Sequence, residues 1–279
     1  MNAKTIQIFL PDGSPRSIRI AEITSRIAKV ILIPRNKLEE AANRNELNNV
    51  GIYFLFGSSN EKAKDLVYIG EAEDCYKRLK QHNKAKGFWN VALVVVSKTN
   101  SFTKSHVKYL EHFAYKKAKE IGRYEVVNDT IPNEPFVTES MHADLMDHFE
   151  TTKILLSTLG YPLFEEVHRN VVTKEVLVCK GRDAYATGEY TDDGLVVYKG
   201  STANFEETRT AGPWVRNLRE KLLNSGVLEQ KEHVFIFTSD YVFSSPSAAA
   251  AAVLGRRANG WTEWKDKEGR TLDELKRKE

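Results

Sequence analysis

Alternating apolar and polar positions at the start of the chain predict β-structure. Apolar side chains alternate with polar ones over residues 6–10 and again over 18–20, with a Pro-Asp-Gly turn between them. This pattern is typical of a β-hairpin. The apolar run 29–33 predicts a further strand that Pro34 ends, and the weak apolar face of 37–48 predicts a helix.

Two apolar runs, 51–57 and 65–70, are separated by a polar loop and predict an antiparallel hairpin. A helix is expected to follow over 75–85, because the carboxylate of Asp74 can accept hydrogen bonds from the free N–H groups of its first turn.

The next segments predict one more strand and two long helices. The run 91–96 is apolar at every position, as expected of a strand in the middle of a sheet. A long helix is predicted over 103–120, where Gly122 can end it, and a short extended segment over 124–128. A connecting helix is predicted over 139–159.

The pattern changes after about residue 165, where shorter elements begin. Short strands are predicted over 174–179, 184–190, 195–198, 234–237 and 241–243. Helices are predicted over 213–224, over the alanine-rich residues 246–255 and after Thr271. On the first of these helices Trp214, Leu218 and Leu222 fall on one stripe, which we expect to be its apolar face.

These elements predict an α+β protein with two domains. The runs 51–57, 65–70 and 91–96 would form three main strands of a small central antiparallel or mixed sheet flanked by helices. We expect an N-terminal extension packed on this module (1–48), the module itself (49–135), a connecting helix (136–164) and a second α+β domain (165–279).

Composition adds little to this outline, but it limits the function classes. The chain has 279 residues, of which 41% are apolar and 28% charged, as in ordinary globular proteins. Its net charge is only +3, so a surface that binds nucleic acid would have to be local.

Cysteine usage and hydropathy point to the cytoplasm. Only two cysteines, Cys75 and Cys179, are present, and they are far apart, which disfavours a disulfide framework and a zinc site. The N-terminus lacks the apolar run of a signal peptide, and no stretch approaches the roughly 20 apolar residues of a membrane span. We therefore expect a cytoplasmic protein without a membrane partner.

Glu111 is a carboxylate where an apolar residue is expected. It falls near the middle of the apolar stripe of its helix, which consists of Val107, Leu110, Ala114 and Ala118. A buried carboxylate without a partner is costly or becomes protonated. We therefore expect Glu111 either to form a salt bridge to a nearby Arg or Lys, or to bind a hard cation such as Mg²⁺.

Four further residues are ordinary when each is taken alone. Arg78 and His82 are one helical turn apart and share a helix face, where one could be a solvated charge and the other a half-buried histidine. Tyr53 and Tyr68 stand at strand positions, where packing with a hydrogen-bonded hydroxyl explains them.

In combination, these residues resemble the GIY-YIG nuclease superfamily. The sequence has Gly51-Ile52-Tyr53 on one strand, Tyr68-Ile69-Gly70 on its hairpin partner, then Arg78, His82 and Glu111. The resemblance covers about residues 50 to 130 and includes the order of strands and helices. The loop between the two tripeptides is longer than is usual in the family.

The resemblance implies hydrolysis of a phosphodiester bond with one divalent ion, Mg²⁺ or Mn²⁺. Glu111 would be the metal ligand, and Tyr53 would act on the attacking water as a general base or through a proton relay. Arg78 would neutralise charge on the phosphoryl oxygens. Tyr68 and His82 would position or activate these groups.

The family also has an asparagine after the glutamate. Asn128 is our choice for a catalytic or supporting position, because it ends the extended segment that follows the long helix. Asn133 is the alternative.

The C-terminal half resembles an uncharacterised domain that often follows a GIY-YIG module in prokaryotic proteins, on the residues 241–250 and 259–264. Mixed basic and aromatic residues make it a candidate for binding nucleic acid. The candidates for contact with nucleic acid are Lys80 in the first domain and Arg256, Arg257, Trp261 and Lys265 in the second. The alternative is that Trp261 packs in a core and that the charges form a solvated face.

These observations predict a metal-dependent endonuclease that acts on DNA in a restriction, defence or repair process. The alternatives are a binding protein with the same fold and negligible turnover, and an effector that cleaves RNA. The sequence favours an enzyme because every catalytic residue type of the family is present.

Overall fold

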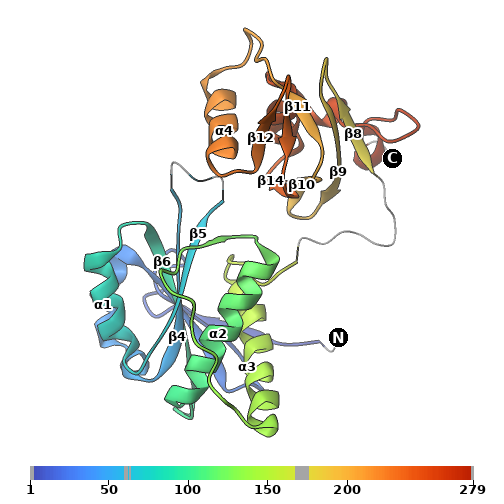
Figure 1. Cartoon of the computed structure of the whole chain (residues 1–279). Coiled ribbons are helices and arrows are strands. Elements are labelled where there is room, and N and C mark those ends of the chain that lie inside the picture. Colours follow the sequence, from blue (N-terminus) through green and yellow to red (C-terminus); the bar gives the residue numbers. More distant parts are fainter. Residues whose placement is uncertain (1–2, 60–61, 63, 167–175, 278–279) are drawn as a thin grey trace. The chain divides into compact units, whose positions relative to one another are not determined.

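The structure is a computed structural model that describes residues 3–59, 62, 64–166 and 176–277 (Figure 1). The chain divides into two compact units, with the boundary after Glu166. Each unit has its own hydrophobic core. Within the described residues, no helix combines the length and hydropathy needed to cross a bilayer.

The first unit is built on a seven-stranded sheet with the order β1-β2-β3-β6-β4-β5-β7. Its strands are β1 (Ile6–Phe9), β2 (Arg19–Ile23), β3 (Ala28–Pro34), β4 (Gly51–Gly57), β5 (Leu66–Ala72), β6 (Trp89–Ser97) and β7 (Glu125–Val126). Only β5 and β7 pair in parallel. The three main strands of the prediction, β4, β5 and β6, are neighbours in this sheet, and the N-terminal strands extend it through the pairing of β3 with β6.

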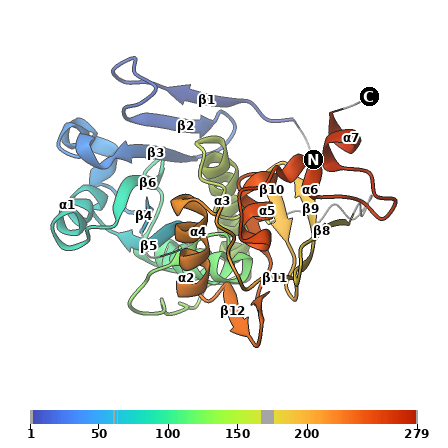
Figure 2. The same cartoon turned by 90° about the horizontal axis from the view of Figure 1, so that it is seen from above.

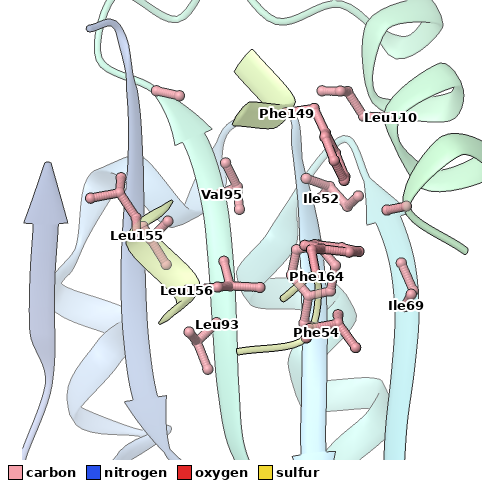
Figure 3. Packing of buried hydrophobic residues seen from close by; sticks show 14 of the residues in the cluster. Ile52, Phe54, Ile69, Leu93, Val95, Leu110, Phe149, Leu155, Leu156 and Phe164 are labelled. Carbon is pink, nitrogen blue, oxygen red and sulfur yellow. The ribbon is translucent and has the colours of Figure 1, made fainter. Parts of the chain in front are cut away.

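Helices cover both faces of this sheet (Figure 2). The helix α1 (Cys75–Ala85) packs on one face, and α2 (Lys104–Ile121) and α3 (Glu139–Thr158) pack on the other. Side chains of β4 alternate between the two layers because successive residues of a strand point to opposite faces. Ile52 and Phe54 face α2 and α3, where Phe149 and Phe164 pack on them (Figure 3), whereas Tyr53 faces α1.

Asp74 and Gly122 mark helix ends as the sequence predicts, whereas Thr103, predicted as the first residue of its helix, is the N-cap. The Asp74 carboxylate accepts a hydrogen bond from the backbone N–H of Lys77 at 2.8 Å, and Thr103 caps α2 in the same way. Gly122 ends α2 in the left-handed conformation with a φ of 65°. These caps fix where α1 and α2 begin, and therefore which side chains face the sheet.

The helix expected over 37–48 is not formed. Three short 3-10 segments take its place: η1 (Arg35–Lys37), η2 (Glu40–Asn43) and η3 (Asn45–Asn48). None of them has a side-chain cap, and the segment is rich in asparagine, which favours turns over helix interiors.

The second unit contains two small antiparallel sheets, with the orders β14-β10-β9-β8 and β11-β13-β12. Its strands are β8 (Leu177–Lys180), β9 (Tyr185–Thr191), β10 (Gly194–Val197), β11 (Thr202–Asn204), β12 (Leu228–Lys231), β13 (Val234–Phe237) and β14 (Tyr241–Phe243). Its helices are α4 (Pro213–Asn224), α5 (Pro246–Leu254), α6 (Gly260–Glu263) and α7 (Leu272–Lys276).

The pattern of the sequence missed β11 and β12, which are short and largely polar. The alanine-rich helix α5 lies in the core of this unit, where its small side chains allow close packing. Residues 174–175 of the first predicted strand lie outside the described residues.

The prediction of the apolar stripe on α4 is wrong in one respect. Trp214 is 44% exposed, and the buried face consists of Val215, Arg219 and Leu222. The Arg219 guanidinium donates a hydrogen bond to the Asn204 carbonyl and lies over the Phe235 ring. A buried arginine thus replaces the tryptophan on the inner face, because the long side chain finds a carbonyl and an aromatic ring there.

Gly70 lies opposite Tyr53 in the β4–β5 pair, and its missing side chain makes room for the phenol. A methyl group at Gly70 would overlap both the hydroxyl and the ring of Tyr53. Tyr53 is only 1% exposed, so the ring has little freedom to move away.

The substitution Gly70→Ala should destabilise the first unit by about 1–3 kcal/mol, because the overlap forces the buried ring out of its position. Urea unfolding followed by circular dichroism measures the change. Gly87→Ala is the matched control, because a side-chain carbon there meets no atom within 4 Å, and it should change the stability by less than about 0.5 kcal/mol. Equal stability of the two variants would show that the space beside Tyr53 does not matter.

Candidate active site

The hydroxyl of Tyr53 is the centre of a buried polar cluster between β4 and α1. It lies 2.8 Å from Nε2 of His82 and accepts a hydrogen bond from Nε of Arg78 at 3.4 Å. His82 is 4% exposed, whereas Arg78 is exposed and also donates to Gln81 at 2.8 Å. The structure therefore brings together three of the residues singled out in the sequence.

Tyr68 completes this cluster on the neighbouring strand β5. Its ring centroid lies 6.3 Å from that of Tyr53 and 5.0 Å from that of His82. The ammonium of Lys86 lies 4.6 Å from the Tyr68 ring centroid and pairs with Asp129 at 3.1 Å. One cation therefore covers the Tyr68 ring.

Burial sets the protonation of the cluster. It lowers the pKa of His82 to about 4, and the charges of Arg78 and Lys86 act in the same direction. Burial also raises the pKa of the Tyr53 phenol, against the opposing effect of Arg78. At neutral pH a neutral imidazole therefore faces a protonated phenol, and a proton can pass between them along the hydrogen bond.

Glu111 lies half-buried on α2, at the position that the apolar stripe indicated. In the described part of the chain it makes no ion pair, so the salt-bridge alternative is not realised there. Burial raises the pKa of this carboxyl to about 7, and the charge of Glu71 adds to the effect. The cations Lys104, Lys108 and Arg78 act in the opposite direction.

The candidate residues lie on both sides of the strand β5. Tyr53 and Tyr68 pack on the face of α1, whereas Glu111 comes from α2 on the other face. Glu111 and Tyr53 nevertheless act on each other electrostatically, since the charge of Glu111 contributes to the raised pKa of Tyr53. A substrate that contacts both groups would have to cross the exposed edge of β5.

Asn128 lies at this edge and bonds to the backbone of β5. Its side-chain amide donates to the Ile69 carbonyl at 2.7 Å and its side-chain oxygen accepts from the Ile69 N–H at 3.0 Å. The backbone pairing with β7 ends at Val67, so this amide continues the ladder beyond it. Asn133 is exposed and has no such contact, which favours Asn128 as the asparagine of the site.

A cleft of about 420 Å³ opens beside Arg78. It is lined by Glu71, Ala72, Glu73, Asp74, Lys77, Arg78, Gln81 and Lys104. The cleft is lined by both acidic and basic side chains. It therefore suits a ligand that carries both negative and positive charge.

Comparison with known families identifies two domains in the chain. Residues 49–125 match the family model of the GIY-YIG catalytic domain. The chain carries a GIY-YIG domain. Residues 177–276 match a family described as domain of unknown function (DUF4357), so the order of the two domains is the predicted one. No curated protein and no solved structure matches the chain.

The match to the GIY-YIG family indicates the general function of the first domain. GIY-YIG domains are endonucleases that act on nucleic acid, and a nuclease-type function follows for this chain.

The candidates for contact with nucleic acid belong to both units. Lys80 is exposed on α1 of the GIY-YIG domain, where its ammonium lies 5.6 Å from the Tyr76 ring centroid. Arg257 and Lys265 are exposed in the DUF4357 domain. These three side chains can reach a ligand without breaking a salt bridge of the described chain.

Arg256 and Trp261 are already engaged within the DUF4357 domain. Arg256 pairs with Glu263 at 2.7 Å. The guanidinium of Arg277 lies 3.4 Å from the Trp261 ring centroid, and the Tyr190 ring meets Trp261 edge-on. The contacts of Trp261 therefore agree better with packing inside the domain than with stacking on a nucleic-acid base.

Three residues of the site were missed in the sequence, namely Glu71, Lys86 and Lys104. Glu71 directly follows the Tyr68-Ile69-Gly70 tripeptide. It was missed because an acidic residue near the end of a strand is normally a solvent-exposed surface residue. Lys104 offered a weak signal, because a cation in the first turn of a helix opposes the helix dipole.

The residues present fit a hard divalent cation. Glu111 offers carboxylate oxygens, which Mg²⁺ prefers, and no cation of the described residues forms an ion pair with them. No group of three or more His, Cys, Asp or Glu side chains could hold a metal among the residues that the structure describes. An ion at Glu111 would therefore keep water for most of its ligands, as Mg²⁺ does.

The raised pKa of Glu111 predicts a pH-dependent gain in stability from Glu111→Gln. Below about pH 4.5 the carboxyl is neutral in the folded and the unfolded chain, but above pH 7 the fold holds a half-buried charge. The stabilisation by Glu111→Gln should therefore grow from pH 5 to pH 8, by about 2–4 °C in the melting temperature of the GIY-YIG domain without metal.

Differential scanning calorimetry in EDTA at several pH values measures this gain. Glu73→Gln is the control, because the Glu73 side chain is 70% exposed and its removal should give no such pH dependence. A constant difference between Glu111→Gln and the wild type across this range would contradict the burial of a charge at Glu111.

Proposed function

We propose that this protein is a metal-dependent endonuclease that hydrolyses phosphodiester bonds of DNA. The observation that carries the proposal is the Tyr53 hydroxyl, which lies 2.8 Å from Nε2 of His82 and accepts a hydrogen bond from Arg78. Glu111, on the other face of the sheet, makes no ion pair within the described residues. A structural tyrosine needs one hydrogen bond, whereas this one has a proton acceptor on one side and an exposed cation on the other.

Tyr53 and His82 would move the proton of the attacking water. As the Tyr53 oxygen takes the proton of the water, its own proton passes along the 2.8 Å hydrogen bond to Nε2 of His82. A neutral His82 is required for this step, and its low pKa keeps it neutral at neutral pH. Tyr68 packs on both rings and holds them in position.

Arg78 and Glu111 would act on the phosphate. The exposed guanidinium of Arg78 can neutralise the charge on the phosphoryl oxygens, because it reaches solvent beside Tyr53. Glu111 would hold Mg²⁺ or Mn²⁺, which polarises the phosphate and stabilises the leaving oxygen when bound. Asn128 would keep the edge of β5 in place beneath the substrate.

A local group of lysines can supply the affinity for DNA that the net charge of +3 does not. Lys77, Lys80 and Lys84 are exposed on α1, and Lys108 is exposed on α2 one turn before Glu111. Within the described chain, none of the four makes an ion pair. We infer that they contact the phosphate backbone on both sides of the site.

The DUF4357 domain would add a second contact to DNA, through the exposed side chains of Arg257 and Lys265. Cleavage by the GIY-YIG domain would then take place on a substrate that is held at two places, which raises the effective concentration of the DNA at the active site.

Tyr53→Phe and Glu111→Ala should each lower metal-dependent cleavage by at least about 100-fold, because one removes the proton-accepting oxygen and the other the metal ligand. Nicking of supercoiled plasmid with Mg²⁺, Mn²⁺ or EDTA measures the loss, with single-stranded DNA and RNA as parallel substrates. Tyr76→Phe on the same helix as His82 is the control and should cleave normally.

Near-normal cleavage by Tyr53→Phe or Glu111→Ala would overturn the roles assigned to these residues. Cleavage of RNA but not of DNA by the wild type would instead make the protein a ribonuclease. Binding of plasmid without cleavage under any metal condition would leave only a non-catalytic binding function.

The combined change of Lys80, Lys84 and Lys108 to Gln should weaken DNA binding and its dependence on salt. For every phosphate that the protein no longer neutralises, the slope of log K against log[salt] becomes shallower by about 0.9. Fluorescence anisotropy with Tyr53→Phe as the background, to prevent cleavage, measures both quantities. Lys4→Gln is the control, because it precedes β1 at the opposite edge of the sheet, and an equal slope in both proteins would contradict the proposed surface.

A further inference from the structure

Trp214 is an exposed tryptophan in the DUF4357 domain. It lies in the first turn of α4, and its side chain is 44% exposed. Trp89 and Trp264 are fully buried, and the guanidinium of Arg277 covers Trp261 at 3.4 Å from its ring centroid. Tryptophan is enriched among the residues that contribute most to binding at interfaces, so this ring is a candidate for contact with a ligand.

Arg257 reaches the start of the same helix. A side-chain carbon at Gly212, the N-cap of α4, would meet Nη2 of Arg257 at 2.8 Å and Nε at 3.1 Å, so the guanidinium packs on this glycine. The helix α4 contacts α5, and Arg257 follows the end of α5 (Figure 2). Within the described residues Arg257 makes no ion pair, and the first turn of α4 has no acidic residue. Its exposed charge is therefore available to a ligand.

The loop before α4 adds a second cation that the protein does not balance. The acidic residues of this loop are already paired: Oε2 of Glu206 lies 3.6 Å from Nη1 of Arg182, and Oε2 of Glu207 lies 3.2 Å from Nε of Arg216. Arg209 in the same loop is exposed and makes no ion pair in the described part of the chain. The surface around the start of α4 therefore has an excess of positive charge.

A buried cation adds to this excess. Arg219 on the inner face of α4 is 1% exposed, and its Nε and Nη1 atoms have no hydrogen-bond partner among the described residues. A side-chain carbon at Gly255 would overlap Nη1 of Arg219, so Arg219 and Arg257 lie near the same end of α5. A buried charge without a counter-charge is costly, and an anion bound nearby lowers this cost. Arg219 therefore strengthens the attraction of this surface for an anion.

We propose that Trp214, Arg209 and Arg257 form a surface of the DUF4357 domain that binds single-stranded nucleic acid. The indole of Trp214 stacks on an unpaired base, and the two guanidinium groups contact neighbouring phosphates. This surface deepens the proposed contact of the DUF4357 domain with DNA, on which the inference rests.

A nucleic acid fits this surface because one ligand then satisfies both the aromatic ring and the unbalanced cations. The GIY-YIG domain of the same chain belongs to a family that acts on nucleic acid. An indole can stack only on a base whose face is free, which favours an unpaired segment over a continuous duplex.

Fluorescence anisotropy of the full-length protein with a labelled oligothymidylate, in EDTA to prevent cleavage, tests this assignment. Trp214→Ala should weaken the binding by at least about fivefold, as expected for the loss of one stacked base. Trp214→Phe should retain most of the affinity, because a phenyl ring still stacks. A DNA duplex of the same length should bind both variants like the wild type, which a misfolded variant would not do.

The emission of Trp214 gives a second readout. Saturating oligothymidylate should quench the tryptophan fluorescence of the wild type, because a stacked base contacts the exposed indole. The quenching should be lost in Trp214→Phe, although this variant still binds. Quenching of equal size in both proteins would show that the base does not stack on Trp214.

The combined change of Arg209 and Arg257 to Gln tests the phosphate contacts. The slope of log K against log[salt] for oligothymidylate should become shallower by about 0.7 for every phosphate that is no longer neutralised. An unchanged slope would overturn the role of the two arginines. Phe136→Ala is the control for the loss of an exposed aromatic ring, because Phe136 is 91% exposed outside the DUF4357 domain, and it should bind like the wild type.

Wild-type affinity of Trp214→Ala for oligothymidylate would overturn this inference, and normal nicking of plasmid by the wild type would then leave the proposed function intact. Equal weakening of single-stranded and duplex binding by Trp214→Ala would overturn the preference for unpaired bases. A wild type that binds oligothymidylate through Trp214 but cleaves no nucleic acid would support the inference and overturn the proposed endonuclease.

Discussion

The space beside Gly70 is the constraint on which the candidate active site depends. Tyr53 fills this space because its cross-strand neighbour has no side chain. At Gly51 a side chain would meet the Val95 carbonyl oxygen at 2.6 Å and the sulfur of Cys75 at 2.8 Å, so this glycine lets α1 approach the sheet. With α1 close, His82 reaches the Tyr53 hydroxyl. A shift of one residue in the pairing of β4 and β5 would turn the tyrosine to the opposite face and separate these groups.

Two chemically different surfaces meet at the edge of β5. The face of α1 holds neutral groups that are buried together, the phenol of Tyr53 and the imidazole of His82, with a cation at the rim. The face of α2 holds the carboxylates of Glu71 and Glu111. Burial disfavours the charged form on both sides: it lowers the pKa of the His82 imidazole and raises the pKa of the Glu111 carboxyl. A phosphate with its metal ion would supply the missing charges between them.

The sequence was sufficient for those features that depend on local periodicity and on the family. The helix period placed Glu111 at a half-buried position, and Asp74 and Gly122 marked helix ends. The approach of Tyr53, Arg78 and His82 was expected only from the resemblance. The pair of Glu71 and Lys104 was missed because its residues are distant in sequence, so no local pattern links them. Arg219 was missed because a charged residue on a helix is normally solvated, and its carbonyl and aromatic partners come from other elements.

The position of each strand in the sheet also affects how easily it opens. The strand β4 is paired along its length with β5 and β6, and β1, β2 and β3 lie beyond β6. Amide protons of β4 are therefore expected to exchange with solvent only when much of the unit unfolds. The part of β5 beyond Ile69, past the pairing with β7 and with the Asn128 side chain, lies at an edge where opening requires less free energy. Tyr53 belongs to the rigid strand and Glu71 to the yielding one. The candidate site thus combines a tyrosine on a fixed strand with a carboxylate near a strand end that can adjust its position.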